Sequence, residues 1–273
     1  MLRHPSVLKV LVEMCQLLGM SCKKPASIDF SFEGFRARGG KTDEHRDGWG
    51  IAFAKPEGFE IYRDEQPAAG SHLADHISKA KIKAKTTIAH IRKATIGEVN
   101  ISNCHPFERK LWDKSWLFCH NGDLKDFAPI LDADFFPEGN TDSELAFCKL
   151  LQDLYRHFPD GEPATEELFD WLHRMSLRIA EHGTFNIMLS NGDWLYTFCS
   201  THLAYVERKY PFTNIELIDT QVSVDLSVHN DQDDHMVIIA TKPLTRNEIW
   251  NVYSPGQARL FRNGNLLYEK TNA

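Results

Sequence analysis

The chain has 273 residues, 42% hydrophobic and 25% charged, which suits an ordinary globular fold built as one large domain or two small ones. The formal net charge of −7 argues against a nucleic-acid partner, because contacts with phosphates need clustered lysine and arginine. No apolar run is long enough to span a membrane, and Lys9 interrupts the short apolar stretch near the start, which argues against export.

Strand-like runs dominate the first half of the chain. One begins at Cys15, and further runs that alternate or stay apolar predict strands downstream. These are Trp49–Ala54, Phe59–Arg63, Thr86–Ile91 and Ser115–His120.

Two helices are predicted in the middle of the chain. The first follows Thr141-Asp142-Ser143-Glu144, which has the Thr-x-x-Glu spacing of a capping box, and Pro159 ends it. The second runs over 165–181, with Gly183 as its C-terminal cap. The expected buried faces are Leu145, Cys148, Leu151 and Tyr155 in the first helix, and Leu168, Leu172, Met175 and Ile179 in the second.

Two hairpins and a buried strand are predicted after the helices. Asn191-Gly192 and Asn263-Gly264 each lie between apolar runs and supply the positive-φ residues of a tight turn. Residues 235–241 form an apolar run typical of a buried strand. Helices clustered between β-rich ends indicate an α+β fold, and no linker divides the chain, so we expect 15–273 to form a single domain.

The six cysteines are scattered and contain no CxxC pair, which indicates reduced thiols and a cytoplasmic protein. Cys104-His105 and Cys119-His120 resemble partial zinc motifs. Adjacent residues on a strand point to opposite faces, so neither pair can chelate as a unit, and we expect no metal site.

Cys15 is the residue whose position suggests chemistry. A lone cysteine is usually a small buried apolar residue. Met14 is a possible initiator, however, and its removal would leave Cys15 with a free α-amine. With a reference pKa of roughly 8, that amine can accept the thiol proton near neutral pH, so one residue would carry nucleophile and base.

Three further positions allow a functional and a structural interpretation. Asn121-Gly122 can form an oxyanion hole or an ordinary turn. Arg92, at the end of an apolar strand, can clamp a carboxylate or be merely solvated. Asp142 can pair with an ammonium group or simply favour the start of its helix.

Taken in order, these motifs resemble the class II glutamine amidotransferases, and most closely their stand-alone, YafJ-like branch. The matching segments are Cys15, the H-x-R-x-A-T-x-G run of His90 to Gly97, the N-x-H-P of Asn103 to Pro106, the His-Asn-Gly of His120 to Gly122, and Thr141 to Glu144. Many relatives have Trp and His where this chain has Lys93 and Ile96, so the identity of the γ-glutamyl substrate is open.

The resemblance implies a four-layer αββα sandwich of the N-terminal nucleophile hydrolase type. It implies that Cys15 attacks the glutamine amide, that Asn121 and Gly122 hold the oxyanion, and that a γ-glutamyl thioester forms before water releases glutamate. The implied substrate-binding residues are Arg92 for the carboxylate, Asp142 for the ammonium group, Thr95 and His105. No cofactor is implied; ammonia would be released or pass to a separate synthase.

Residues 1–14 present a problem for this chemistry, because a peptide bond to Met14 removes the basicity of the Cys15 amine. They can be a mis-assigned start, which we favour, or a propeptide that is removed. If they stay, the protein is a non-catalytic module that binds glutamine or glutamate. A hydrolase of γ-glutamyl conjugates is a further alternative.

Overall fold

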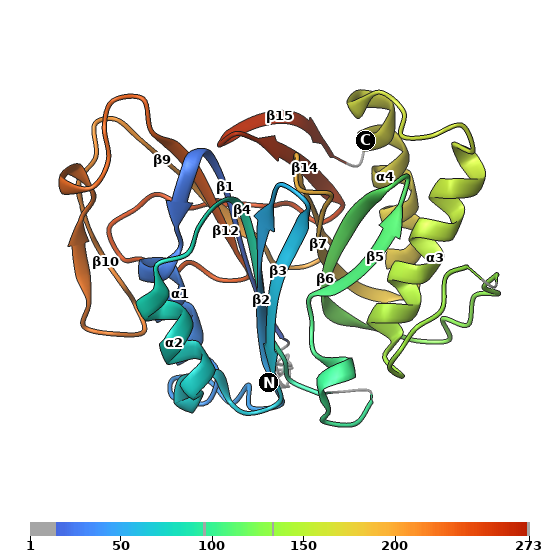
Figure 1. Ribbon diagram of the computed structural model, residues 1–273, viewed down its shortest axis with the longest axis horizontal. Helices are drawn as coiled ribbons and strands as arrows, with labels where there is room; N and C mark the ends of the chain where they lie inside the picture. Colours follow the sequence, from blue (N-terminus) through green and yellow to red (C-terminus); the bar gives the residue numbers. More distant parts are fainter. Residues whose placement is uncertain (1–14, 95–96, 133, 272–273) are drawn as a thin grey trace, which may run out of the picture.

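The computed structural model describes residues 15–94, 97–132 and 134–271 (Figure 1). The expected N-terminal extension, residues 1–14, lies outside this range, as does Thr95. None of the helices in the described residues is long and apolar enough to cross a membrane.

Two antiparallel sheets form the centre of the molecule (Figure 1). Sheet I has the order β13-β9-β12-β1-β4-β2-β3, and sheet II has the order β15-β14-β8-β7-β6-β5. The strands of sheet I are β1 (Gln16–Ser27), β2 (Trp49–Lys55), β3 (Gly58–Asp64), β4 (Lys83–Ile91), β9 (Ala204–Lys209), β12 (His235–Ala240) and β13 (Asn251–Val252). Those of sheet II are β5 (Phe107–Leu111), β6 (Lys114–Leu124), β7 (Gly183–Ser190), β8 (Leu195–Cys199), β14 (Gln257–Arg262) and β15 (Asn265–Lys270).

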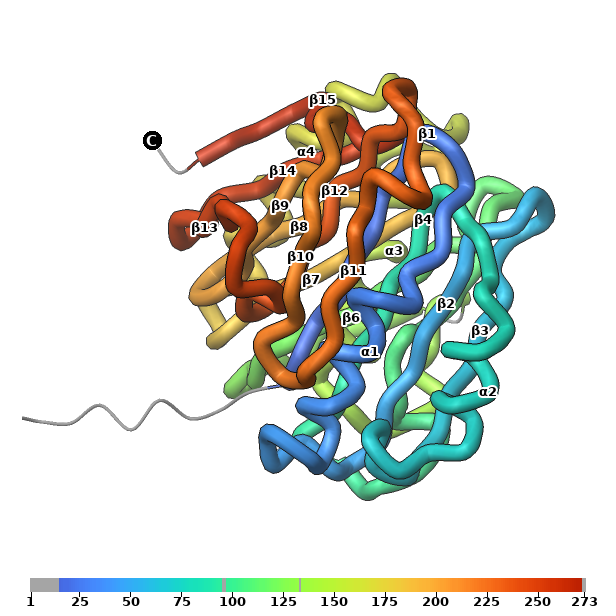
Figure 2. The backbone as a smooth tube through the Cα atoms, turned by 90° about the vertical axis from the view of Figure 1, so that its left-hand side faces the viewer, coloured from blue at the N-terminus to red at the C-terminus, as the bar shows by residue number. Residues whose placement is uncertain are grey.

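Helices cover the outer face of each sheet. Figure 1 shows α1 (Asp29–Ala37) and α2 (His72–Ala80) beside sheet I, and α3 (Asp142–His157) and α4 (Thr165–Ala180) beside sheet II. Figure 2 shows a two-stranded ribbon, β10 (Asn214–Glu216) and β11 (Ser223–Asp225), near β9 and β12. Single 3-10 turns occur at η1 (Ala68–Gly70), η2 (Ile101–Asn103) and η3 (Leu226–Val228).

Apolar side chains of the described residues pack into one cluster between each pair of layers. Phe32 of α1 packs with sheet I, and Phe147 of α3 packs with sheet II. Leu17 and Leu117 belong to a third cluster between the two sheets. Because successive strand residues point to opposite faces, each sheet can serve two clusters. The expected four-layer αββα sandwich is therefore confirmed.

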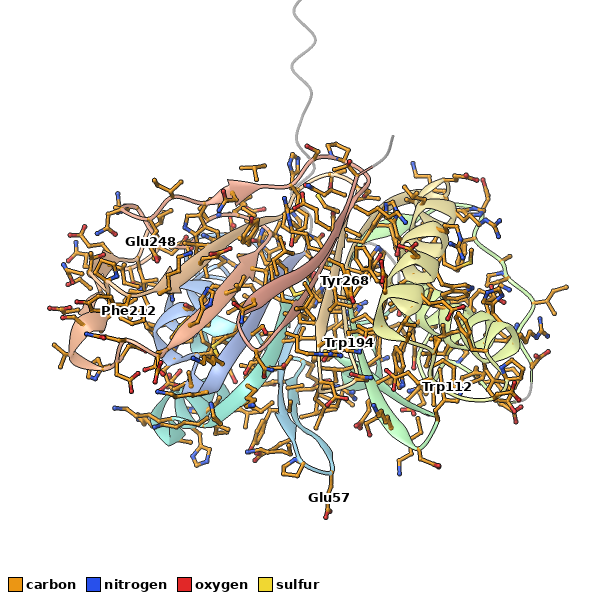
Figure 3. The ribbon with its side chains drawn as sticks, turned by 90° about the horizontal axis from the view of Figure 1, so that it is seen from above. Glu57, Trp112, Trp194, Phe212, Glu248 and Tyr268 are labelled. Atoms are coloured by element: carbon orange, nitrogen blue, oxygen red, sulfur yellow. The ribbon has the colours of Figure 1, made fainter. Side chains whose placement is uncertain are left out.

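An aromatic group reinforces the far edge of sheet II. The Trp116 ring lies 5.8 Å from that of Trp112 and 5.3 Å from that of Trp194, both in edge-to-face geometry. Figure 3 labels Trp112 and Trp194, which come from two different hairpins of the sheet. Such pairs add about 0.5–1.5 kcal/mol each beyond their buried area.

The predicted strands and hairpins are confirmed, with one correction at a turn. Asn263 and Gly264 both have positive φ, at 52° and 75°. In the other hairpin only Gly192 does, at 95°. Asn191 instead uses its side chain, whose Oδ1 accepts a hydrogen bond from the Asp193 N–H at 3.1 Å. The expectation of positive φ at Asn191 is therefore wrong, because an Asx turn serves there.

The two mid-chain helices are confirmed, but their details differ from the prediction. Thr141 caps α3 by accepting from the Glu144 N–H, whereas the Glu144 carboxylate reaches the N–H groups of Glu138 and Gly139 and so does not complete a capping box. Tyr155 is 45% exposed, so the buried face ends at Leu154. Gly183 begins β7 and is not a cap; a Cβ there would lie 2.1 Å from the Asp123 carbonyl.

The prediction that helices cluster only in mid-chain is wrong, because α1 and α2 precede them. Helix α1 has no side-chain cap and contains Gly34, so it carries little local signal. Helix α2 is capped by Ser71 and ends at Ala80, followed by Lys81 at φ 49°. Both helices are stabilised mainly by packing on sheet I.

We predict that Phe147→Ala lowers the free energy of unfolding by about 3–5 kcal/mol, because this fully buried ring stacks on Phe118 with centroids 5.0 Å apart. Tyr155→Ala on the exposed side of the same helix should change it by less than about 0.5 kcal/mol. Urea unfolding of the two variants measures the difference. Similar losses in both would contradict the assigned face.

Candidate active site

Cys15 lies at the start of the strand in the middle of sheet I. Its Sγ accepts a hydrogen bond from the Lys93 N–H at 3.2 Å and contacts the Lys93 carbonyl at 3.4 Å. Two residues later, the Leu17 N–H donates to Thr241 Oγ1 at 2.9 Å, and the Leu17 carbonyl accepts from the Thr241 N–H at 3.1 Å. The thiol is thus held by Lys93, which lies just after β4, and the strand behind it is held by Thr241, just after β12.

A small pocket surrounds the thiol, with a volume of about 20 Å³, room for about one water molecule. It brings together five of the expected residues from five separate segments. Its lining is Cys15, Arg92, Lys93, His105, His120, Gly122, Thr141, Asp142 and Ser143. Asn121 is not part of the lining, and Thr95 lies outside the described residues.

Arg92 is a buried cation at the pocket wall, 3% exposed. Its backbone N–H donates to the Gly48 carbonyl at 2.8 Å, which fixes the end of β4. Its guanidinium donates to the carbonyls of Glu98 at 2.9 Å and Gly97 at 3.1 Å. The interpretation of Arg92 as a solvated strand end is therefore wrong: backbone carbonyls orient a buried positive charge toward the thiol's pocket.

Asn121-Gly122 belongs to a strand and not to a turn, so the turn interpretation is wrong. The two residues pair with Asn186 and Phe185 of β7. A Cβ on Gly122 would lie 1.8 Å from the Thr184 carbonyl oxygen, so no side chain fits there. The Asn121 amide donates to Thr241 Oγ1 at 3.2 Å, and no described residue makes a hydrogen bond to its Oδ1.

Asp142 is half-buried at the first turn of α3. Its Oδ2 accepts from the Leu124 N–H at 2.8 Å, and its Oδ1 accepts from the Ser143 N–H at 2.8 Å. A carboxylate here is also favoured by the helix dipole. Asp142 therefore stabilises the start of α3, as the structural interpretation expected. Its side chain also lines the pocket.

His120 and Ser143 line the pocket although neither was expected there. His120 Nε2 lies 2.9 Å from the Thr184 carbonyl, which can only accept, so Nε2 carries the proton. Nδ1, 2.8 Å from Ser143 Oγ, is then the acceptor. His120 does point away from Cys119, as expected, but the fold brings α3 to meet it. The His-Asn-Gly motif alone does not indicate that partner.

Burial is the main influence on the titrating groups of the site. It raises the pKa of the Cys15 thiol to about 11, against the opposing effects of the Lys93 backbone and the Arg92 cation. It lowers the pKa of His90 to about 3 and holds the pKa of His105 well below its usual range. It also lowers the pKa of His120. At neutral pH the thiol is protonated and these imidazoles are uncharged.

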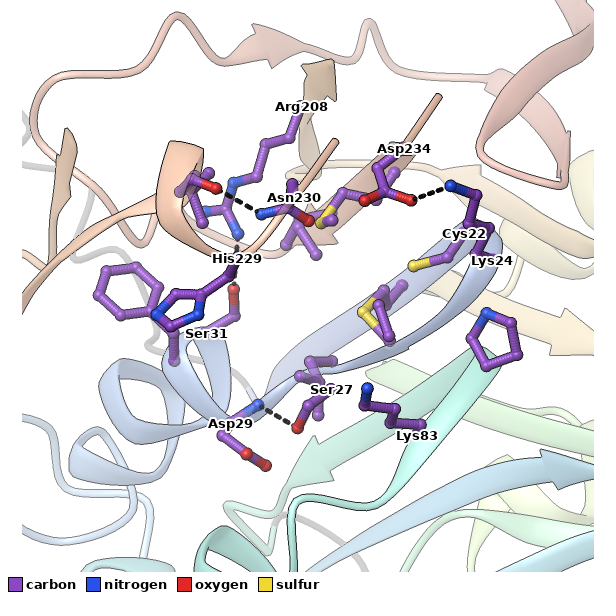
Figure 4. Close-up of a pocket in the computed structure, with 18 of the residues that line it drawn as sticks. Cys22, Lys24, Ser27, Asp29, Ser31, Lys83, Arg208, His229, Asn230 and Asp234 are labelled. Atoms are coloured by element: carbon purple, nitrogen blue, oxygen red, sulfur yellow. Dashed lines mark hydrogen bonds and ion pairs between the residues drawn. The ribbon is translucent and has the colours of Figure 1, made fainter. Parts of the chain in front are cut away.

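A larger cavity, of about 530 Å³, lies away from Cys15 over the outer face of sheet I (Figure 4). Its floor includes Met20 and Cys22. Its charged lining residues mostly pair with protein groups: Lys24 with Asp231 and Asp234, and Arg208 with Glu248 and Ser31. The Cys15 pocket is smaller, but it gathers the expected chemical groups, so we take it as the candidate active site.

Comparison with known proteins agrees with this architecture. The family model described as glutamine amidotransferases class-II matches residues 14–273. A Haemophilus influenzae protein named as a glutamine amidotransferase is 46% identical over 270 residues, covering 98% of this chain and 92% of that protein. Escherichia coli K12 YafJ, also named as a glutamine amidotransferase, is 40% identical over 248 residues, covering 91% and 97%. The crystal structure of a predicted glutamine amidotransferase from Pseudomonas aeruginosa has a TM-score of 0.74 at 38% identity, covering 93% of this chain and 100% of that chain.

The four-layer sandwich with a cysteine heading a central strand defines an N-terminal nucleophile type of hydrolase fold. Within that class, the chain belongs to the class II glutamine amidotransferases. Members of this family are enzymes that hydrolyse or transfer the side-chain amide of glutamine. The resemblance seen in the sequence motifs, including the YafJ-like branch, is confirmed.

We predict that Cys15 in the chain carrying residues 1–14 reacts slowly with iodoacetamide at neutral pH. With its pKa near 11, about one thiol in a thousand is ionised at pH 8, and the rate should rise about tenfold per pH unit up to pH 10. The other five cysteines are buried, so mass spectrometry of the modified peptide isolates Cys15. A plateau near pH 8.5 would contradict the desolvated environment.

We also predict that His90 makes stability depend on pH. Below about pH 6.5 the unfolded chain binds a proton at His90 that the folded chain refuses until about pH 3, so the free energy of unfolding falls as pH falls across that window. His90→Gln should flatten the slope between pH 4 and 6 by roughly 1 kcal/mol per pH unit. Urea midpoints measure it, with His76→Gln, exposed on α2, as the control that should leave the slope unchanged. An unchanged slope in the His90 variant would refute the prediction.

Proposed function

We propose that this enzyme hydrolyses the side-chain amide of glutamine, or of a related γ-glutamyl amide, through a γ-glutamyl thioester on Cys15. The observation that carries the proposal is the pocket itself. It joins a thiol fixed at a strand end, a buried guanidinium and a carboxylate from three segments distant in sequence. A nucleophile between two opposite charges suits a zwitterionic amino acid with a reactive side chain.

The high pKa of the thiol means that a base must remove its proton before attack. A free α-amine on Cys15, with a reference pKa of roughly 8, is suited to that task. Sulfur then adds to the amide carbon, and the nitrogen leaves as ammonia after the amine returns the proton. Water next cleaves the thioester, which releases glutamate and restores the thiol.

Arg92 and Asp142 are the proposed clamps for the substrate's two charged ends. Arg92 would take the α-carboxylate, because it is a buried cation at the pocket wall and a guanidinium can bind a carboxylate through two parallel hydrogen bonds. Asp142 would take the α-ammonium, since each carboxylate oxygen has lone pairs beyond those used by Leu124 and Ser143. Thr95 and His105 complete the proposed substrate-binding set.

Asn121 and Gly122 are the proposed oxyanion hole. The Asn121 amide points to Thr241 Oγ1, beside the strand that carries Cys15. Gly122 lines the pocket and leaves its backbone accessible because it has no Cβ. In a preorganised site, one such donor contributes on the order of 3–4 kcal/mol to lowering the barrier.

The mature enzyme would begin at Cys15 and consist of the single domain 15–273, with residues 1–14 removed or never translated. The described cysteines are all free thiols, which supports a cytoplasmic location. Ammonia would be released or used by a separate acceptor enzyme. Because the sequence departs from the family pattern at Lys93, which lines the pocket, hydrolysis of γ-glutamyl conjugates is a second candidate activity.

We predict that protein beginning at Cys15 releases glutamate from glutamine, or from a γ-glutamyl conjugate, while Cys15→Ser loses this activity about 1,000-fold or more. The chain that retains residues 1–14 should also be inactive, because its Cys15 nitrogen is an amide. Cys22→Ser, in the remote larger cavity, is the matched control and should keep full activity. A glutamate assay over a panel of γ-glutamyl compounds measures all four proteins.

Full activity of the chain that retains residues 1–14 would refute the amine as base. Activity that survives in Cys15→Ser would refute the thioester. Binding of glutamate by calorimetry without turnover in any preparation would support the binding module instead.

A further inference from the structure

His90 and His105 form a buried pair beside the Cys15 pocket. His90 is 0% and His105 3% exposed, and their ring centroids lie 4.2 Å apart. His90 faces the space between the sheets from β4, and His105 lines the pocket. No described residue makes a hydrogen bond of ordinary length and angle to any of the four ring nitrogens, although the backbone of His120 lies close enough to His90 to act on it as a weaker hydrogen-bond partner.

This arrangement differs from that of two other buried imidazoles, His120 and His173. His120 uses both ring nitrogens, and His173 Nε2 lies 2.9 Å from the Gly256 carbonyl. A neutral imidazole has one donor and one acceptor, and burying either without a partner costs about 1–3 kcal/mol. Native proteins seldom tolerate several such groups together, so the pair indicates a small polar partner.

The charge state of the pair restricts what that partner can be. Burial lowers the pKa of both rings, and the charges of the nearby His120 and Arg92 act in the same direction on both, while the backbone of His120 opposes the shift at His90. A bound carboxylate would favour the imidazolium form, which this environment opposes. The pair therefore requires an uncharged partner that can both donate and accept hydrogen bonds, and water is the simplest such molecule. The adjoining pocket has room for about one water molecule.

We propose that His90 and His105 hold a water molecule at the wall of the Cys15 pocket, and that this water hydrolyses the thioester. The inference rests on the proposed function and concerns only its second half. The water oxygen adds to the γ-carbonyl carbon, and the carbon–sulfur bond breaks with its electron pair on sulfur. The water proton passes to the Cys15 α-amine and then to the thiolate, which yields glutamate and free enzyme.

The two histidines are positioning residues in this step. Their low pKa values make them poor proton acceptors at neutral pH, so they orient the water through hydrogen bonds while the amine takes the proton. Losing them should therefore slow the cleavage of the thioester more than its formation. Misplacing a reacting group by about 1 Å can cost roughly 100-fold in rate.

The test uses His105→Phe in protein that begins at Cys15. A phenyl ring has a similar shape and can still pack on Phe107, whose ring lies 4.3 Å from that of His105. We expect steady-state glutamate release to fall about 10- to 100-fold. We also expect γ-glutamyl thioester on Cys15 to accumulate, measured by intact mass after acid quenching. Hydroxylamine, a nucleophile that replaces water, should restore turnover as γ-glutamyl hydroxamate.

His90→Gln gives a second reading if the phenylalanine variant fails to fold. It removes the imidazole but keeps a donor and an acceptor, and it should accumulate thioester to a smaller extent. His173→Asn is the control for loss of a buried imidazole elsewhere; it should leave the thioester fraction at the wild-type level. Circular dichroism of each variant verifies folding.

The proposal is overturned if folded His105 or His90 variants lose activity with no accumulation of thioester and no recovery by hydroxylamine. That result would limit the pair to substrate binding or to a role in the fold, with no part in the cleavage of the thioester. Undiminished hydrolysis in both variants would overturn it too. If wild-type protein that begins at Cys15 forms no thioester and releases no glutamate, the proposed function itself fails, which is a distinct outcome.

Discussion

The hydroxyl of Thr241 joins the two sheets at the point on which the site depends. It accepts from the Leu17 N–H at 2.9 Å and from the Asn121 amide at 3.2 Å. Leu17 lies on the strand that begins after Cys15, and Asn121 lies in sheet II. Because β1 is paired on both sides, it cannot slide without breaking two ladders. The thiol therefore has a fixed position relative to groups on both sheets.

A hydrogen-bond network centred on Asn103 connects the loop that holds Arg92 to the loop that leads into α3. The Asn103 amide donates to the Glu98 carbonyl at 2.9 Å and to Asn140 Oδ1 at 2.8 Å, and its Oδ1 accepts from the Asn140 N–H at 3.0 Å. Glu98 in turn orients Arg92, while Asn140 leads into the helix that carries Asp142. One buried side chain thus sets the separation of the two charged groups. This explains why the N-x-H-P motif begins with asparagine.

Local pattern was enough to predict most strands and an α+β class, whereas the four-layer sandwich and the set of residues around the thiol were predicted from the resemblance of the motifs to a known family. The sequence pattern could not predict which distant residues each side chain or helix contacts in the folded chain. Helix α1 has no cap and a glycine in its middle, so only its packing on sheet I reveals it. His120 meets Ser143 across 23 positions. Glu144 has the spacing of a capping box, but its carboxylate instead pairs with Arg109 and accepts hydrogen bonds from two loop N–H groups.

Burial in the pocket affects both the thiol and the histidines that could act as its base. The same desolvation that raises the pKa of the thiol lowers that of every imidazole lining the pocket, so neither His105 nor His120 suits the role of base near neutral pH. Asp142 already accepts two backbone hydrogen bonds, and Arg92 carries no acceptor. None of these four lining side chains, His105, His120, Asp142 and Arg92, is therefore matched to the proton of Cys15. A terminal amine on the same residue would have a suitable pKa and need no additional pocket, so the proposed mechanism depends on whether the mature chain begins at Cys15.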